Sequence, residues 1–112
     1  GIDTDERAPG YKHVIINPRL NNFFSYAKGS FYSMYGEIRS EWYKEDKSIK
    51  MKVQIPCNTT ATVVLPYAKI ENVKENDTHL DRLEGISEYR QMKEEIRLGL
   101  SSGAYEFSYS IK

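Results

Sequence analysis

Short runs in which apolar and polar residues alternate recur along the chain, and a period of two is the pattern of a strand with one buried face. The clearest run is 49–55, which has Ile, Met, Val and Ile at its odd positions and Lys, Lys and Gln at its even ones. The run 37–45 alternates in the same way, and the Asp-Lys-Ser segment 46–48 suits a hairpin turn between the two. The pattern therefore predicts a β-hairpin with one face in the core.

Further strands are predicted on both sides of this hairpin. Apolar or aromatic runs bounded by Pro, Gly or Asn occupy 11–18, 23–36, 61–67 and 104–111. In the last run the aromatic and apolar residues at 105, 107, 109 and 111 share one face. About seven or eight short strands, with turn signals every 8–12 residues or so, predict an all-β fold, an antiparallel β-sandwich of Greek-key or jelly-roll type.

Residues 80–100 fit two secondary structures. Their Glu, Lys, Arg and Met content favours a helix, and the Leu, Tyr and Ile residues make a ragged helical stripe. Gly85 and Gly99 argue against one long helix. The residues alone leave room for one short helix within 78–92.

The first ten residues differ from the rest in being polar, with three Asp or Glu, one Pro and two Gly. This composition predicts a linker over 1–10, followed by a single domain over 11–112. A chain of 112 residues suits one such domain with one modest core.

The charge balance narrows the class of partner. Lys and Arg number 16, and so do Asp and Glu, so the formal net charge is zero. Nucleic-acid binders usually carry a basic excess, so no nucleic-acid partner is predicted. No apolar run approaches the ~20 residues of a spanning helix, so no membrane partner is predicted either. No cofactor motif is present, and the compartment cannot be read from the sequence.

The residue types that most often carry chemistry are sparse. His13 falls in an apolar strand and His79 in a polar loop, without further ligands at metal-binding spacing. Glu37 and Glu41 share a strand face, as two hydrolytic carboxylates could, but Arg39 between them would neutralise the pair. No catalytic, cofactor-binding or metal-binding residue is therefore predicted.

The stretch IPCNTTATVVLP, residues 55–66, contains the single cysteine and an Asn-x-Thr pattern at Asn58. One cysteine excludes an internal disulfide and a cysteine-based metal site. Cys57 has no neighbouring histidine and no helix N-terminus in view, so an inert, half-buried thiol in a strand-to-strand connection is predicted.

Tyrosine and the other aromatics make up 12% of the chain. They concentrate between residues 23 and 43, and strand alternation sends about half of them to the core. The rest could form a platform for sugar or a contact with another domain. The candidate surface residues are Tyr26, Tyr32, Tyr35 and Trp42.

Four stretches in order carry a family resemblance: APGYKHVIINP (8–18), YAKGSFYSMYGEIRSEW (26–42), IPCNTTATVVLP (55–66) and SSGAYEFSY (101–109). Together they resemble the C-terminal β-sandwich domain of bacterial α-L-rhamnosidases. The resemblance covers nearly the whole chain and is weakest over 68–98. It implies strands at 85–92 and 95–100, with Lys93 and Glu94 near a turn.

The resemblance also implies a function. In that family a helical-barrel catalytic domain precedes this domain and holds the carboxylates that hydrolyse terminal α-L-rhamnose from glycosides. The chain is then a non-catalytic accessory domain whose partner is the catalytic domain of its own parent, with residues 1–10 as the exit from the barrel. The alternative is a carbohydrate-binding module that recruits rhamnose-containing polysaccharide through exposed aromatics.

Overall fold

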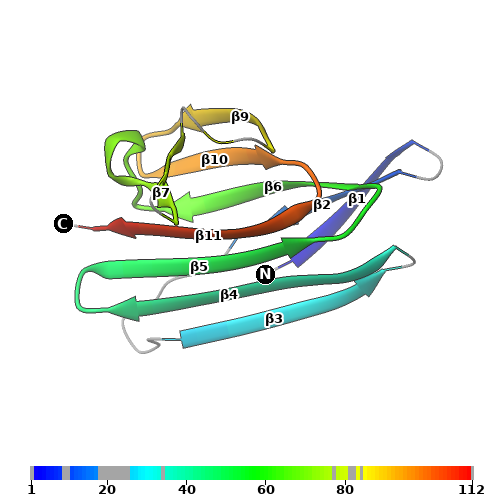
Figure 1. Cartoon of the computed structure of the whole chain (residues 1–112), viewed down its shortest axis with the longest axis horizontal. Coiled ribbons are helices and arrows are strands. Elements are labelled where there is room, and N and C mark those ends of the chain that lie inside the picture. Colours follow the sequence, from blue (N-terminus) through cyan, green and yellow to red (C-terminus); the bar gives the residue numbers. More distant parts are fainter. Residues whose placement is uncertain are drawn as a thin grey trace.

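The computed structural model describes residues 2–8, 11–17, 26–33, 35–76, 78–80, 83 and 85–111. Two β-sheets pack face to face (Figure 1), which confirms the all-β sandwich. The five-stranded sheet, here sheet A, has the order β1-β2-β6-β10-β9, and the six-stranded sheet B has the order β3-β4-β5-β11-β7-β8. Phe23 and Phe24, at the start of the predicted run 23–36, lie outside the described residues.

The strands of sheet A are β1 (Ile2–Ala8), β2 (Tyr11–Ile16), β6 (Thr59–Pro66), β10 (Glu95–Leu100) and β9 (Ile86–Gln91). Those of sheet B are β3 (Tyr26–Ser33), β4 (Gly36–Glu45), β5 (Ser48–Ile55), β11 (Gly103–Ser110), β7 (Lys74–Glu75) and β8 (Thr78–His79). A 3₁₀ turn, η1 (Ile70–Asn72), joins the two sheets between β6 and β7.

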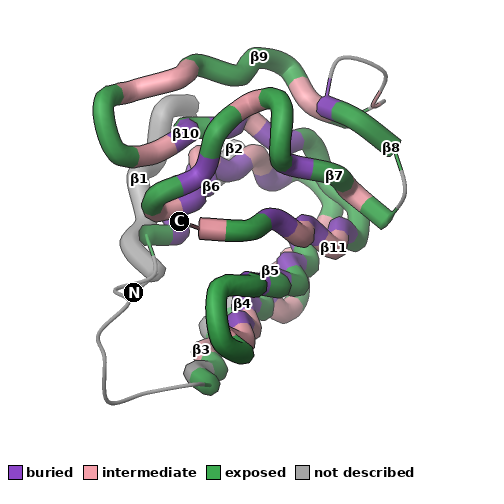
Figure 2. Tube along the Cα trace, turned by 90° about the vertical axis from the view of Figure 1, so that its left-hand side faces the viewer, coloured by how far each residue is buried: buried purple, intermediate pink, exposed green. Residues whose placement is uncertain are grey.

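The core lies between the sheets, where buried residues of both face one another (Figure 2). The predicted alternation is confirmed in β5, where every second residue from Ile49 to Ile55 is at most 3% exposed. Phe107 of β11 is the largest fully buried side chain among those that the structure describes. Alternation thus decides which face of each strand joins the core.

Strand β1 corrects the prediction of a linker over residues 1–10. The backbone of Ile2–Ala8 pairs antiparallel with β2, with Ile2 opposite Ile16 and Ala8 opposite Tyr11. Pairing with β2 therefore gives a polar sequence a regular structure that its composition does not favour. That the segment also leads out of a preceding domain stays a prediction.

Within the ambiguous segment 80–100, residues 86–91 and 95–100 form strands, as the family resemblance implies. Strands β9 and β10 pair antiparallel, and Met92–Glu94 lie in the turn between them. The short helix allowed within 78–92 is wrong for the residues described there, which contain no α-helix. Pairing of β10 with β6 as well as β9 outweighs local helix propensity.

One strand pair departs from the predicted antiparallel arrangement. Strands β2 and β6 are parallel, with His13 opposite Thr60 and Ile15 opposite Thr62. The His13 ring is clamped by two hydroxyls, with Nδ1 2.7 Å from Thr60 Oγ1 and Nε2 2.8 Å from Thr62 Oγ1. His13 thus has a structural role in this strand pair.

A buried tyrosine joins the two sheets. Tyr109 of β11 is 5% exposed, and its hydroxyl donates to the carbonyl of Pro66 in β6 over 2.9 Å. Burial raises the pKa of Tyr109 above its ordinary value of 10.0 because the phenolate cannot be solvated there.

This burial predicts a loss of stability at alkaline pH. The pKa of Tyr109 is higher in the folded state than in the unfolded state. The contribution of its neutral hydroxyl to the free energy of unfolding is therefore complete below about pH 10. It falls as pH rises further, by up to about 1.4 kcal/mol per pH unit. Tyr109→Phe is expected to lower the free energy of unfolding by about 1 kcal/mol at neutral pH. Urea titrations at a series of pH values should show the two proteins converging above about pH 10. Parallel profiles would contradict the assignment.

Candidate functional site

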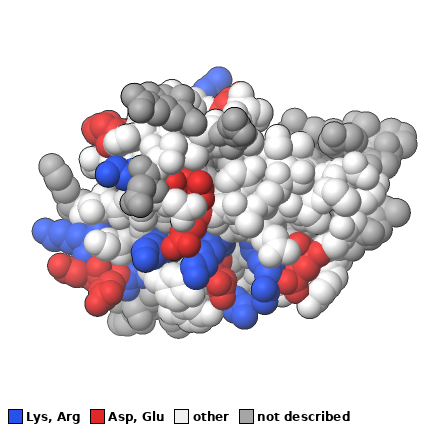
Figure 3. All heavy atoms as spheres, in the orientation of Figure 1, with Lys and Arg blue, Asp and Glu red and all other residues white. Residues whose placement is uncertain are grey.

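The outward face of sheet B carries charged side chains of both signs, which form a band across the molecule (Figure 3). Their order follows from strand register. Lys28 of β3 lies opposite Glu41 of β4, Glu41 opposite Lys52 of β5, and Lys52 opposite Glu106 of β11. We call these four residues the charge row; signs alternate along it, so each charge faces an opposite one across the strands.

The ion pairs on this face differ in closeness. Arg39 Nε lies 2.6 Å from Glu37 Oε1, whereas Lys28 Nζ lies 3.8 Å from Glu41 Oε1. Lys50 Nζ reaches Glu106 Oε1 over 3.9 Å. Exposed pairs of this kind each contribute about 0–1 kcal/mol, so their main effect is to neutralise the face.

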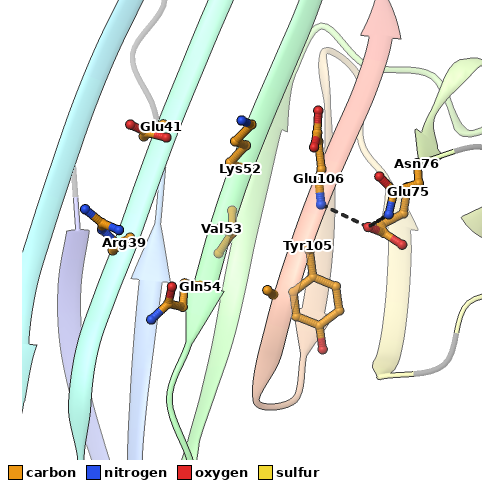
Figure 4. A pocket seen from close by; sticks show the side chains of 10 residues that line it. Arg39, Glu41, Lys52, Val53, Gln54, Glu75, Asn76, Tyr105 and Glu106 are labelled. Carbon is orange, nitrogen blue, oxygen red and sulfur yellow. Dashed lines mark hydrogen bonds between the residues drawn. The ribbon is translucent and has the colours of Figure 1, made fainter.

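A shallow groove of about 360 Å³ crosses the face where β7 meets β11 (Figure 4). Its lining residues come from four strands and the turn after β7: Arg39, Glu41, Lys52, Val53, Gln54, Glu75, Asn76, Ala104, Tyr105 and Glu106. Oε2 of Glu75 accepts the backbone N–H of Glu106 over 3.0 Å and Asn76 Nδ2 over 2.8 Å, which fixes that wall.

The opposite wall of the groove keeps free polar groups. Within the described part of the chain, the Lys52 ammonium and the Gln54 amide form no ion pair or hydrogen bond. Both point outward beside Glu41 and Arg39 (Figure 4). The groove can therefore offer an ammonium, an amide and carboxylate oxygens to a hydroxyl-bearing ligand.

The charge row predicts the effect of reversing its central member. Lys52→Glu would place three carboxylates in register and is expected to cost about 1 kcal/mol at low salt, because like charges directly opposite one another repel. Most of that cost should vanish at about 1 M salt. Gln54→Glu is the matched control, because its cross-strand neighbours are Arg39 and Ala104. Equal destabilisation of both variants in urea titrations would contradict the row's role.

The four candidate aromatics do not form one surface. Tyr26 and Tyr32 are 46% and 77% exposed and lie on the outward face of β3, near its two ends. Tyr35 is half-buried beside the turn before β4. Trp42 is only 4% exposed and packs in the core, so it cannot belong to an exposed platform. Its face was already set by the alternation of 37–45.

The exposed tyrosines have polar neighbours. Tyr26 stacks at a tilt on Tyr43, with ring centroids 5.0 Å apart, and its hydroxyl donates to Glu41 Oε1 over 3.4 Å. A hydrogen bond to Glu37, followed by the charge of that carboxylate, raises the pKa of Tyr32. Glu37 and Glu41 thus each bind separate partners, which is unlike a pair of cooperating hydrolytic carboxylates.

Cys57 and His79 both lie at the surface. Cys57 occupies the β5–β6 connection as predicted, but its thiol is exposed and not half-buried, with Sγ 4.0 Å from the carbonyl oxygen of Tyr35. Asn58 beside it adopts a left-handed φ of 54°, a conformation that Asn tolerates better than most residues, as suits a tight strand-to-strand connection. His79 is exposed in the two-residue strand β8 rather than in a loop.

The described residues offer neither a metal site nor a membrane-spanning helix. No group of three or more His, Cys, Asp or Glu side chains is arranged there to hold a metal ion. Nor does the described part contain a helix with the length and apolar character needed to cross a membrane.

Fold and site together define a two-sheet β-sandwich with a neutralised polar face and a shallow groove. The chain belongs to the bacterial alpha-L-rhamnosidase C-terminal domain family, whose family model matches residues 1–80.

Relatives of known name agree with this assignment. An alpha-L-rhamnosidase of Formosa agariphila is 29% identical over 110 residues, which cover 98% of this chain and 11% of that protein. An alpha-L-rhamnosidase of Streptomyces avermitilis is 32% identical over 57 residues, 51% of this chain and 6% of that protein. The chain therefore spans only about a tenth of the length of the first of these relatives.

Solved structures share the fold. The alpha-L-rhamnosidase from Dictyoglumus thermophilum superposes with a TM-score of 0.74 at 23% identity, over 88% of this chain and 11% of that one. The Streptomyces avermitilis alpha-L-rhamnosidase, solved in complex with L-rhamnose, gives a TM-score of 0.73 at 21% identity, over 88% and 9%.

Proposed function

We propose that the chain is a non-catalytic accessory domain of a larger α-L-rhamnosidase, in which it packs on the helical-barrel catalytic domain and stabilises it. The observation that carries the proposal is the share of a relative that the chain matches. It aligns with only 11% of the length of the Formosa agariphila alpha-L-rhamnosidase, so about nine-tenths of that enzyme lies outside the matched region. The separate pairing of Glu37 and Glu41 supports the non-catalytic part, because hydrolysis of a glycoside needs two carboxylates facing one scissile bond.

Deleting the whole domain, including strand β1, from the parent enzyme tests the proposal. The truncated enzyme is expected to unfold at a lower temperature, or to give a lower folded yield, while correctly folded molecules still cleave a rhamnoside. Unchanged thermal unfolding would contradict the stabilising role. Loss of turnover by truncated molecules that keep their fold and stability would contradict the non-catalytic role.

A second function is favoured by the groove itself. Its volume lies within the range of small-ligand sites, and its free Lys52 and Gln54 groups suit sugar hydroxyls. We propose, as the alternative, that this groove binds rhamnose-containing saccharide. Titration of the chain with L-rhamnose and rhamnosylated oligosaccharides, followed by NMR, should then shift the resonances of the groove residues. Gln54→Ala should weaken binding more than the control Ser30→Ala on β3 does. No shift at millimolar sugar would remove this alternative.

A further inference from the structure

The two outward faces of the sandwich differ in charge. The outward face of sheet B is charged on β3, β4, β5 and β11. On sheet A, the adjacent strands β2 and β6 present no charged residue among their described outward side chains. Charged residues flank them on both sides: Glu95 and Arg97 on β10, and Asp3 and Asp5 on β1, whose backbone register places them opposite Ile15 and His13. We call the outward residues of these two strands the neutral face: His13, Ile15, Thr60, Thr62, Val64 and Pro66. His13 and Val64 are already buried within this chain, so Ile15, Thr60, Thr62 and Pro66 are the members that a partner could contact.

The neutral face is also stiff. Ile15, Thr60, Thr62 and Val64 are all β-branched, which restricts χ1, and His13 is held by two threonine hydroxyls at 2.7 and 2.8 Å. Such side chains lose little rotamer freedom when another surface covers them, whereas Lys, Arg and Glu on sheet B lose much more. The neutral face therefore suits a permanent contact better than the charged face does.

Desolvation favours the same choice. Covering the sheet B face would remove water from two ion pairs, Arg39–Glu37 and Lys28–Glu41. The attraction within each pair does not reliably offset the cost of that desolvation. The buried centre of a protein interface is typically depleted of charge. The neutral face meets this condition and still presents Ile15, which is 36% exposed on an inner strand.

The path of the chain brings a partner to this sheet. Strand β1 pairs directly with β2, and its first residue, Ile2, lies opposite Ile16. In a family of C-terminal domains, the rest of the parent precedes this strand and amounts to about nine-tenths of the enzyme. Whatever is joined to β1 is thus tethered one strand away from the neutral face.

We propose that the neutral face of β2 and β6 is the surface on which the preceding catalytic part of the parent packs, and that the charged face of sheet B stays in water. The inference rests on the proposed accessory function and names its contact surface. It replaces the aromatic segment around Tyr26 and Tyr32 as the expected contact between domains.

Two lysine substitutions in the full-length parent separate the faces. Ile15→Lys is expected to lower the temperature at which this domain detaches or unfolds, because the new ammonium must be desolvated at the contact. Tyr32→Lys, at a site 77% exposed on sheet B, is the matched control and should leave that temperature unchanged. Hydroxyl-radical footprinting of the unmodified parent adds a readout that needs no variant: Ile15 should be oxidised several-fold more slowly than its exposure predicts, while Tyr32 reacts freely.

The outcomes distinguish this inference from the function on which it rests. If deletion of the domain does not alter the parent's stability, the accessory function fails. If deletion destabilises the parent, but Tyr32 is the protected residue and Tyr32→Lys the damaging change, the function stands and the neutral face is wrong. Protection of Ile15 in the 112-residue chain alone, rising with its concentration, would assign the face to a second copy and also overturn the inference.

Discussion

Replacing Phe107 with alanine is expected to lower the free energy of unfolding by about 3–5 kcal/mol. Phe107 is fully buried in β11, opposite Met51 of β5 on one side and Glu75 of β7 on the other. Its ring stacks on Tyr105 with centroids 6.0 Å apart and planes at 6°. Truncation would leave a cavity between two sheets that are held in place by their own hydrogen bonds, so the void cannot close fully.

Urea unfolding measures this effect, with Tyr32→Ala as the control. Tyr32 is an aromatic of similar size but 77% exposed on β3, and its removal should change the free energy of unfolding by about 0.5 kcal/mol or less. The total free energy of unfolding of a small domain is only about 5–15 kcal/mol. The urea midpoint of Phe107→Ala should therefore lie far below that of the unsubstituted chain. Similar urea midpoints for the two variants would contradict the burial of Phe107 in the core.

Replacing Gly85 with alanine is expected to cost about 2–4 kcal/mol, from two sources. Gly85 has a φ of +86°, a conformation that L side chains rarely adopt, and an added Cβ would lie 2.6 Å from the Tyr105 hydroxyl. That hydroxyl donates to the carbonyl of Ser101 over 2.8 Å, and the Ser101 N–H donates to the carbonyl of Gly85 over 2.8 Å. The methyl group would therefore displace a hydroxyl that ties three segments together.

A double-mutant cycle isolates the steric part of this cost. Tyr105→Phe alone should cost about 1 kcal/mol, since it removes one hydrogen-bonding hydroxyl. In the Tyr105→Phe background, Gly85→Ala should lower the free energy of unfolding by less than it does in the unsubstituted chain. The clashing oxygen is then gone, and only backbone strain remains. Strictly additive costs in urea titrations would show that the hydroxyl contact does not limit residue 85.

The fold could be predicted where one strand face is apolar and the other polar. Strand β5 and its neighbour β4 were predicted from alternation alone, including the burial of Ile49 and Ile38. Strand β1 was missed because IDTDERA has no such alternation, and its structure comes from pairing with β2. The parallel register of β2 and β6 has no local signal either, because it joins residues 47 positions apart.

The candidate site was less predictable for the same reason. Lys52 and Gln54 were recognised as outward-facing, but nothing in the sequence brings Glu75 and Asn76 beside Glu106. The groove exists only because the two-residue strand β7 pairs with β11. The aromatic residues led to a wrong prediction instead, since Trp42, one of the four candidate surface residues, is a core residue.

The parallel pairing of β2 with β6 also bears on how the domain assembles. The β4–β5 and β9–β10 hairpins close through short local turns, whereas β6 takes both neighbours from distant parts of the chain. Closing such long loops is slow, so we expect the hairpins to form first and the β1–β2 ribbon to dock on β6 late. During synthesis, that ribbon emerges well before its partner strand exists. Until β6 arrives, one edge of β2 is open to pairing with other chains, which exposes the start of this domain to aggregation during synthesis.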